Sequence, residues 1–176
     1  MGLMDRIRKT FSDKKEPEGR LEVNMSNLRV GDLVEYDLKT WEAAKVNSYE
    51  FDGDITKEFV LKNLKDSDDD DLYIEKSEDG WMVGISIPIA KLDPNLKIIL
   101  DEKGEPPSKF HYKGTTYHLD EEGTGYLEGK RFDYWDFIDE EDEKSIGISS
   151  WPNAGFECTV SEWQPERKFK VQPGSI

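Results

Sequence analysis

Short runs of alternating apolar and polar residues, separated by turn residues, extend from residue 31 to beyond residue 160. Residues 31–46 (Gly-Asp-Leu-Val-Glu-Tyr-Asp-Leu-Lys-Thr-Trp-Glu-Ala-Ala-Lys-Val) predict a turn, a strand, a tight reversal and a second strand. Because successive side chains of a strand point to opposite faces, Trp81, Val83, Ile85 and Ile87 share one face of another strand. Asp52-Gly53 is a hairpin signal. This pattern predicts an all-β chain.

The pattern of residues 31–46 returns in weaker form at residues 111–118. Shifted by 76 residues, large apolar positions of the two halves coincide, as for Tyr36 with Tyr112 and Trp41 with Tyr117. We therefore expect about ten short antiparallel strands in two similar halves, as one barrel or two packed sheets. Chance register between two alternating halves is the alternative. The predicted organisation is a basic tip and polar linker (1–20), a first half (21–92), a connector with one more strand at 96–100 (93–108) and a second half (109–172).

The chain is strongly acidic, with a net charge of −15, but its first 15 residues hold five basic and two acidic side chains. An acidic body repels nucleic acid, so we expect no nucleic-acid partner. The apolar side chains of the tip recur at helical spacing and predict a short basic helix that contacts an anionic membrane or a partner helix. A frayed tail, or a helix packed on its own domain, is the alternative. The predicted docking residues are Leu3, Met4, Arg6, Ile7, Arg8, Lys9 and Phe11.

Two acidic tracts, residues 66–71 and 139–143, raise the question of calcium. The first departs from the EF-hand pattern, since its sixth position is Asp71 rather than glycine and its twelfth is Ser77 rather than glutamate. We therefore expect solvated loops and no metal. His111 and His118 are predicted surface residues, and Cys158 a small core residue. No catalytic residues and no cofactor are expected, because no known catalytic motif occurs.

The aromatic residues are the remaining candidates for binding. Five of them are candidate ligand-binding residues: Tyr36, Trp41, Tyr117, Trp135 and Trp151. They could line a pocket with an acidic rim that attracts a peptide or a small cation of the polyamine type. Packing of these aromatics in a core is the alternative.

Several segments resemble a bacterial family, the domain of unknown function 4178. They include Gly-Asp-Leu-Val-Glu-Tyr-Asp at 31–37, Glu-Phe-Val-Leu at 58–61, Asp-Gly-Trp at 79–81 and Ser-Ile-Gly-Ile at 145–148. The resemblance covers residues 26–172 and implies a bacterial cytoplasmic β-rich protein. Relatives accompany small membrane proteins, phage-shock-protein-A-like stress factors and polyamine synthase-like proteins. The hairpin of residues 30–46 also looks like the first hairpin of Tudor or SH3-like barrels, which bind peptides.

These observations lead to one function hypothesis and one alternative. The hypothesis is a non-enzymatic accessory or scaffold module of the bacterial cytoplasm. It would bind a protein partner, serve in envelope stress and lie at the inner membrane through residues 1–15. The single cysteine fits a reducing compartment. The alternative is a β-barrel that binds a small cation or a peptide in an aromatic, acidic-rimmed pocket.

Overall fold

The computed structural model describes residues 22–174, so the predicted basic helix and docking residues of the tip lie outside the described residues. The described chain is mostly antiparallel sheet, which confirms the all-β prediction. Its strands are β1 (Leu33–Tyr36), β2 (Lys39–Phe51), β3 (Asp54–Asn63), β4 (Leu72–Ser77), β5 (Gly80–Ile87), β6 (Lys109–Tyr112), β7 (Thr115–Leu127), β8 (Lys130–Ile138), β9 (Lys144–Trp151), β10 (Gly155–Pro165) and β11 (Lys170–Gln172). Its helical segments are η1 (Met25–Asn27), α2 (Ile89–Leu92), α3 (Pro94–Lys103) and η2 (Glu166–Lys168).

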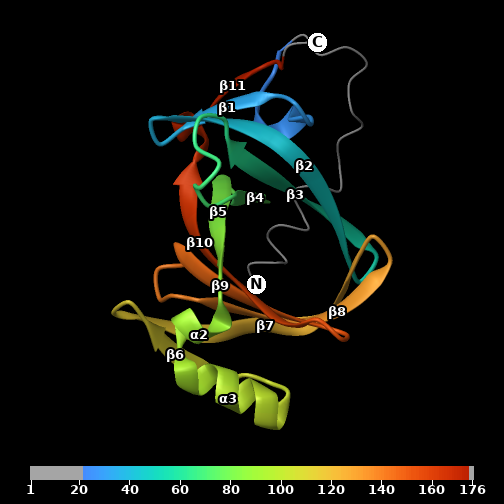
Figure 1. Cartoon of the computed structure of the whole chain (residues 1–176), viewed down its shortest axis with the longest axis vertical. Coiled ribbons are helices and arrows are strands. Elements are labelled where there is room, and N and C mark those ends of the chain that lie inside the picture. Colours follow the sequence, from blue (N-terminus) through green and yellow to red (C-terminus); the bar gives the residue numbers. More distant parts are fainter. Residues whose placement is uncertain (1–21, 175–176) are drawn as a thin grey trace.

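All described strands belong to one sheet with the order β11-β1-β2-β3-β4-β5-β10-β9-β8-β7-β6. A further pairing of β2 with β7 brings Tyr49 opposite Leu127 and turns the strands between them into a ring. The ring is not a regular barrel, because this closure involves two residue pairs only. In Figure 1, β1 to β5 lie in the upper part of the molecule, and β6, β7, β8, α2 and α3 lie in the lower part.

Tight turns form where the sequence predicts them. Asp52 and Gly53 both have positive φ, 51° and 87°, and join β2 to β3. Glu128 and Gly129 do the same between β7 and β8, with φ of 50° and 79°. Two successive residues of positive φ match the right-handed twist of the flanking strands, so these turns fix the register of both hairpins.

The predicted strand at 96–100 is wrong, because this segment is the helix α3. The Asp93 side chain accepts a hydrogen bond from the backbone N–H of Asn95 at 2.8 Å and caps the first turn. Pro94 occupies the first helical position, and Gly104, at φ 74°, ends the helix. Leu96 and Leu100, four positions apart, point the same way into a core. A short apolar run fits either a strand or a helix, and here the end signals decide.

Two β-bulges reverse which face of a strand a given position occupies. The register of β2 against β3 shifts between Ala43 and Lys45, and that of β7 against β8 between Leu119 and Glu121. Because of the extra residue, odd-numbered side chains before the bulge and odd-numbered side chains after it point to opposite faces of the sheet. Trp41 is therefore in a core, whereas Tyr49, eight positions later on the same strand, faces the interior of the ring.

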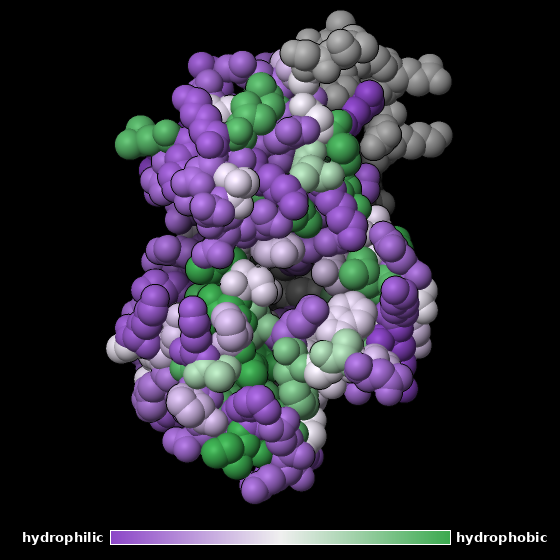
Figure 2. All heavy atoms as spheres, viewed as in Figure 1, coloured by the Kyte–Doolittle hydropathy of each residue, from purple (hydrophilic) through white to green (hydrophobic). Residues whose placement is uncertain are grey.

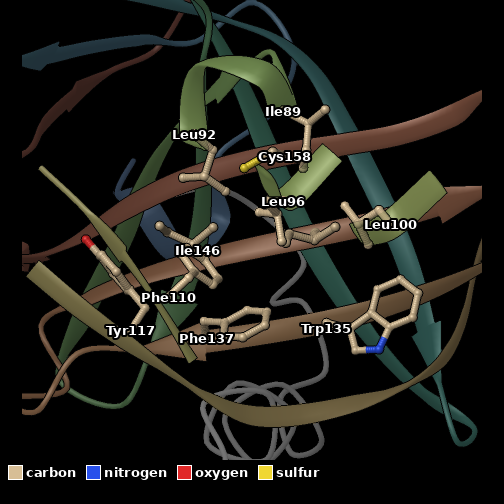
Figure 3. Packing of buried hydrophobic residues seen from close by; sticks show 11 residues of the cluster. Ile89, Leu92, Leu96, Leu100, Phe110, Tyr117, Trp135, Phe137, Ile146 and Cys158 are labelled. Atoms are coloured by element: carbon tan, nitrogen blue, oxygen red, sulfur yellow. The ribbon is translucent and has the colours of Figure 1, made fainter. Parts of the chain in front are cut away.

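The ring packs its apolar face into two separate cores. One core lies on β1 to β5 and is covered by Met25, Leu28 and β11, with Leu61, Ile74 and Trp81 fully buried. The other lies on β8 to β10 and is covered by α2, α3 and β6. Figure 3 shows the helix residues Leu96 and Leu100 meeting the strand residues of this second core: Phe110, Tyr117, Trp135, Phe137 and Ile146. The opposite face of the same strands is left to line the inside of the ring.

Candidate functional site

A cavity of about 840 Å³ lies inside the ring. Its walls come from β2, β3, β4, β5, β8, β9 and β10, on the face turned away from the two cores, and Leu127 at the end of β7 also lines it. In Figure 2 the surface is hollowed between the upper and lower parts of the molecule, and the residues around the hollow are both hydrophilic and hydrophobic. A space of this size is ample for a small organic ligand.

Strand register sets which side chains meet in the cavity. Across three neighbouring strands, Asn47 pairs with Glu58, and Glu58 pairs with Glu75. The same row continues to Met82 on β5. Directly opposite residues of an antiparallel pair have β-carbons about 5 Å apart, so the amide and the two carboxyl groups form a polar row on one wall.

Small residues on the other walls leave the space open. Gly147 and the serines at 145, 149 and 161 face the cavity from β9 and β10. A β-carbon at Gly147 would lie 3.3 Å from the carboxylate of Asp136. These short side chains line the walls without filling the cavity.

Glu58 and Glu75 are the chemical centre of the cavity. Glu58 is 8% exposed, and its Oε1 accepts hydrogen bonds from Asn47 Nδ2 at 2.8 Å and from the Tyr49 hydroxyl at 3.3 Å. The two carboxyl groups also share a hydrogen bond. Glu58 already accepts hydrogen bonds from two other donors, which favour its ionised form. Glu75 is therefore the protonated member of the pair, and its carboxyl O–H donates to Glu58.

Burial raises the pKa of both carboxyl groups. Burial raises the pKa of Glu58 above its usual range, although hydrogen bonds from Asn47, Glu75 and Tyr49 oppose the rise. Burial also raises the pKa of Glu75, well above its usual range, and the negative charges of Glu58 and Asp136 raise it further. The pair therefore keeps a proton at a pH at which exposed glutamates have lost theirs.

The other charged residues of the cavity are two acidic residues on its walls and two basic residues near a hairpin turn. Asp136 on β8 and Glu157 on β10 add carboxylates to the lining. Lys130 and Arg131 lie at the start of β8, close to the β7–β8 turn, and are exposed. Arg131 forms an ion pair with Asp133 at 3.3 Å. The positive charge of the lining thus lies at the rim, near the hairpin turn.

Aromatic side chains form one end of the cavity. Phe51, Phe132 and Tyr134 make a small cluster, with Tyr49 and Trp151 packed against it. Phe132 stacks on Trp151 with ring centroids 4.6 Å apart, and Phe51 meets Tyr134 edge-to-face at 5.1 Å. Because these rings contact one another, they form an apolar wall rather than an open cage around a cation.

The structure places the five predicted ligand-binding aromatics in three different environments. Trp151 lines the cavity and donates a hydrogen bond from Nε1 to Glu157 at 3.1 Å. Trp41 is buried in the first core, where Tyr36 packs and stacks on a ring of the C-terminal segment. Tyr117 and Trp135 are buried in the second core. The predicted pocket residues therefore do not come together, and four of them pack in the cores.

The sequence pattern did not single out the polar row of Asn47, Glu58 and Glu75. Polar residues that alternate with core-facing residues along a strand usually point to solvent, and these three residues show the same alternation. Gly147 and the serines two positions before and after it are the sequence feature that indicates a cavity, since a strand face exposed to solvent rarely requires such small residues.

The other candidates of the sequence lie outside the cavity. His111 and His118 are exposed strand residues, and Cys158 is buried in the second core, which confirms these predictions. Burial raises the pKa of the Cys158 thiol to about 12, so it stays protonated. In the first acidic tract, Asp69 binds Lys39 and Asn63, each at 2.6 Å. Among residues 22–174, no group of three or more His, Cys, Asp or Glu side chains has an arrangement suited to a metal ion.

We expect Glu75→Gln to become increasingly stabilising, relative to the wild type, as the pH rises. A carboxyl group whose pKa is raised by folding stabilises the protein below its unfolded pKa, and this stability is lost as the pH rises through the folded pKa. Glutamine cannot ionise, yet it can still donate a hydrogen bond to Glu58. Thermal melts between pH 5 and pH 9 should show the Tm difference growing by about 2–8 °C, or about 1–2 kcal/mol.

The matched control is Glu50→Gln, because Glu50 is an exposed residue of β2 that points away from the cavity. Its Tm difference should change little with pH. A Tm difference for Glu75→Gln that is constant from pH 5 to pH 9 would contradict the shared proton.

Fold and cavity together define a class: a small all-β domain whose strands form a ring around a polar interior. The chain belongs to the family described as "Domain of unknown function (DUF4178)", whose model matches residues 29–166. This confirms the resemblance seen in the sequence. A protein of Aquifex aeolicus (strain VF5), described as an uncharacterized protein, is 27% identical over 176 residues, covering 94% of this chain and 97% of its own. No solved structure gives a significant match to this chain. No helix among the described residues is long and apolar enough to cross a membrane.

Proposed function

We propose that this protein is a non-enzymatic binding protein for a small organic cation that carries ammonium groups. The observation that carries the proposal is the pair of carboxyl groups, Glu58 and Glu75, placed side by side on the wall of a large cavity. Buried carboxylates are costly unless they are paired with a positive group. A ligand cation supplies that group.

The lining supports a cation of elongated shape. The carboxyl groups of Glu58, Glu75 and Asp136 lie on the strands, and the aromatic cluster of Phe51, Phe132 and Tyr134 lies toward the hairpin turns. An aliphatic chain between two amines fits such a lining, because its methylene groups can pack on the rings while its amines meet the acids. A binding role is favoured over catalysis because the cysteine and both described histidines lie outside the cavity.

We also propose that the two halves of the chain arose by duplication. The bounds of β1 and β6, of β2 and β7, and the start of β3 and β8 each differ by 76 residues. Both bulges keep the same spacing. The two halves differ at the positions of the polar row and its neighbour. The positions equivalent to Tyr49, Glu58 and Glu75 are occupied by Gly125, Tyr134 and Ser149. On this view the first half supplies the carboxyl pair, and the second half supplies Gly147 and the serines of the other walls together with Asp136 and Glu157.

The expected cytoplasmic location and the docking of a protein partner or membrane through residues 1–15 stay predictions, since the tip lies outside the described residues. The ligand proposal does not depend on them.

The proposal is tested by titrating the full-length protein with 1,4-diaminobutane and with spermidine. We expect a Kd between micromolar and millimolar, as suits a ligand of few atoms. At about 100 times the Kd, the ligand should stabilise the fold by about 2.7 kcal/mol and raise the Tm by about 5–10 °C. Calorimetry and thermal melts measure the two quantities.

Two probes of matched length serve as controls. 1,4-Butanediol has the same chain without charge, and succinate has the opposite charge. Neither should raise the Tm. Equal stabilisation by diol and diamine would mean that the cavity does not select cations, and would overturn the proposal.

A further inference from the structure

We propose that the ligand binds through a primary or secondary ammonium group that replaces the proton shared by Glu58 and Glu75, so that one proton leaves for each ligand that enters. This rests on the proposed function and deepens it. It names the chemical class of the ligand, excludes quaternary ammonium groups and couples binding to pH.

The geometry of the carboxyl pair is the first step of the argument. Glu58 and Glu75 are directly opposite each other on β3 and β4, and their carboxyl groups share a hydrogen bond. Two carboxylates in contact cannot both be ionised without a positive group between them. Without a ligand, the shared proton serves as that group. An ammonium group can take the same place.

An unused acceptor beside the pair is the second, independent step. Asn47 is 6% exposed and lines the cavity, and its Nδ2 donates to Glu58. Its Oδ1 is buried and accepts no hydrogen bond from any residue among those described. A buried carbonyl without a donor is costly, so a ligand N–H is its natural partner.

Three acceptor groups therefore lie in one row across β2, β3 and β4: the Asn47 Oδ1, and a carboxylate oxygen each of Glu58 and Glu75. A primary ammonium group has three N–H donors and no acceptor, which complements this set. A secondary ammonium has two donors and can still bridge the carboxylates. A quaternary ammonium has none, and its methyl groups would leave all three acceptors unsatisfied.

The charge balance of the exchange is the third step. In the step, Glu75 loses its proton to solvent and the resulting carboxylate pairs with the N–H groups of the incoming ammonium. The two carboxyl groups carry a net charge of −1 with their shared proton and −1 with one ammonium group in its place, so the net charge at the pair does not change; the second ammonium of a diamine lies elsewhere in the cavity. Neither oxidation nor bond formation between heavy atoms is involved.

The groups around the pair favour a cation at this place. Tyr49 contacts Glu58 from β2, and Asp136 acts on Glu75 from β8. Tyr73 on β4, Tyr134 on β8 and Glu157 on β10 are further titratable residues of the lining, and Lys130 and Arg131 lie exposed at the start of β8. Lys45, on β2, attracts Glu58 but is exposed. The surroundings are acidic overall, so they hold an ammonium more readily than they would hold two bare carboxylates.

The test is calorimetry of 1,4-diaminobutane binding at pH 6 to pH 8, in phosphate and in MOPS, whose ionisation enthalpies differ greatly. The dependence of the observed enthalpy on the buffer gives the number of protons released. We expect release to approach one proton per ligand at pH 6 and to fall toward zero as the pair deprotonates. The amines stay protonated over this range, since alkyl amines have pKa values near 10. The bis-trimethylammonium analogue should bind at least 10-fold more weakly.

The Glu75→Gln variant distinguishes proton release from ligand binding. The variant should still bind the diamine, more weakly, but should release no proton. Diamine binding without proton release in the wild type, or proton release that persists in Glu75→Gln, would overturn this inference while leaving the proposed function standing. Equal affinity for the quaternary analogue would do the same. Absence of binding by every amine would instead overturn the proposed function.

Discussion

Glu58→Gln is expected to weaken the binding of 1,4-diaminobutane about 10- to 100-fold. The substitution keeps the shape of the side chain and an oxygen that can accept from Asn47 and Tyr49. It removes the negative charge, and a hydrogen bond to a charged group contributes about 1.5–3 kcal/mol. Calorimetric titration at pH 8 measures the change in Kd directly.

The thermal stability of the variant shows whether weaker binding results from loss of the site or from loss of the fold. Glu58→Gln should melt within a few degrees of the wild type, because an isosteric amide in place of a buried carboxyl group leaves no cavity. Glu50→Gln, on β2 and exposed, should bind as the wild type does. If Glu58→Gln binds the diamine with unchanged Kd, the carboxyl pair is not the binding site, whatever else the cavity holds.

Much of the fold follows from local pattern. Turn residues with positive φ, such as Asp52 and Gly53, lie where the sequence has its hairpin signals, and the alternation of Trp81 to Ile87 gives a strand. These features depend on residues close together in the chain. Helix α3 was mistaken for a strand because its apolar run is short, although Asp93 and Gly104 mark its ends.

The cavity is harder to predict because it depends on how the sheet closes. Glu58 and Glu75 alternate with Phe59 and Ile74, as solvent-facing residues of a half-buried sheet would. Only the pairing of β2 with β7 turns that polar face inward. Neither residue pair of that closure has a local signal, so the sequence identifies the polar face but not that it lines a cavity.

The bulge in β2 separates two aromatic residues of one strand. Trp41 and Tyr49 are both odd-numbered residues of β2, so regular alternation would place them on the same face. The extra residue at the β2 bulge separates them, leaving Trp41 in the first core and Tyr49 beside Glu58. The 76-residue shift then places Tyr117 in the second core for the same reason. A bulge without glycine has no clear sequence signature, so this reversal becomes visible only in three dimensions.

Phe137→Ala is expected to lower the free energy of unfolding by about 3–5 kcal/mol and the Tm by about 6–20 °C. Phe137 is fully buried in the second core and meets Phe110 edge-to-face, with ring centroids 4.7 Å apart. Removing its ring takes away transfer free energy and leaves a cavity under helix α3. Ile98→Ala, on the exposed side of the same helix, should change stability by less than about 0.5 kcal/mol.

The same measurement shows whether the two cores unfold together. Leu61→Ala, in the first core, should cost about 2–5 kcal/mol. The cores share one sheet, since β5 pairs with β10 over eight residue pairs and β2 with β7 over two. We therefore expect one cooperative transition, lowered by either variant and followed equally by circular dichroism and tryptophan fluorescence. Two transitions, each sensitive to one variant only, would mean that the halves unfold independently and that the cavity between them opens without global unfolding.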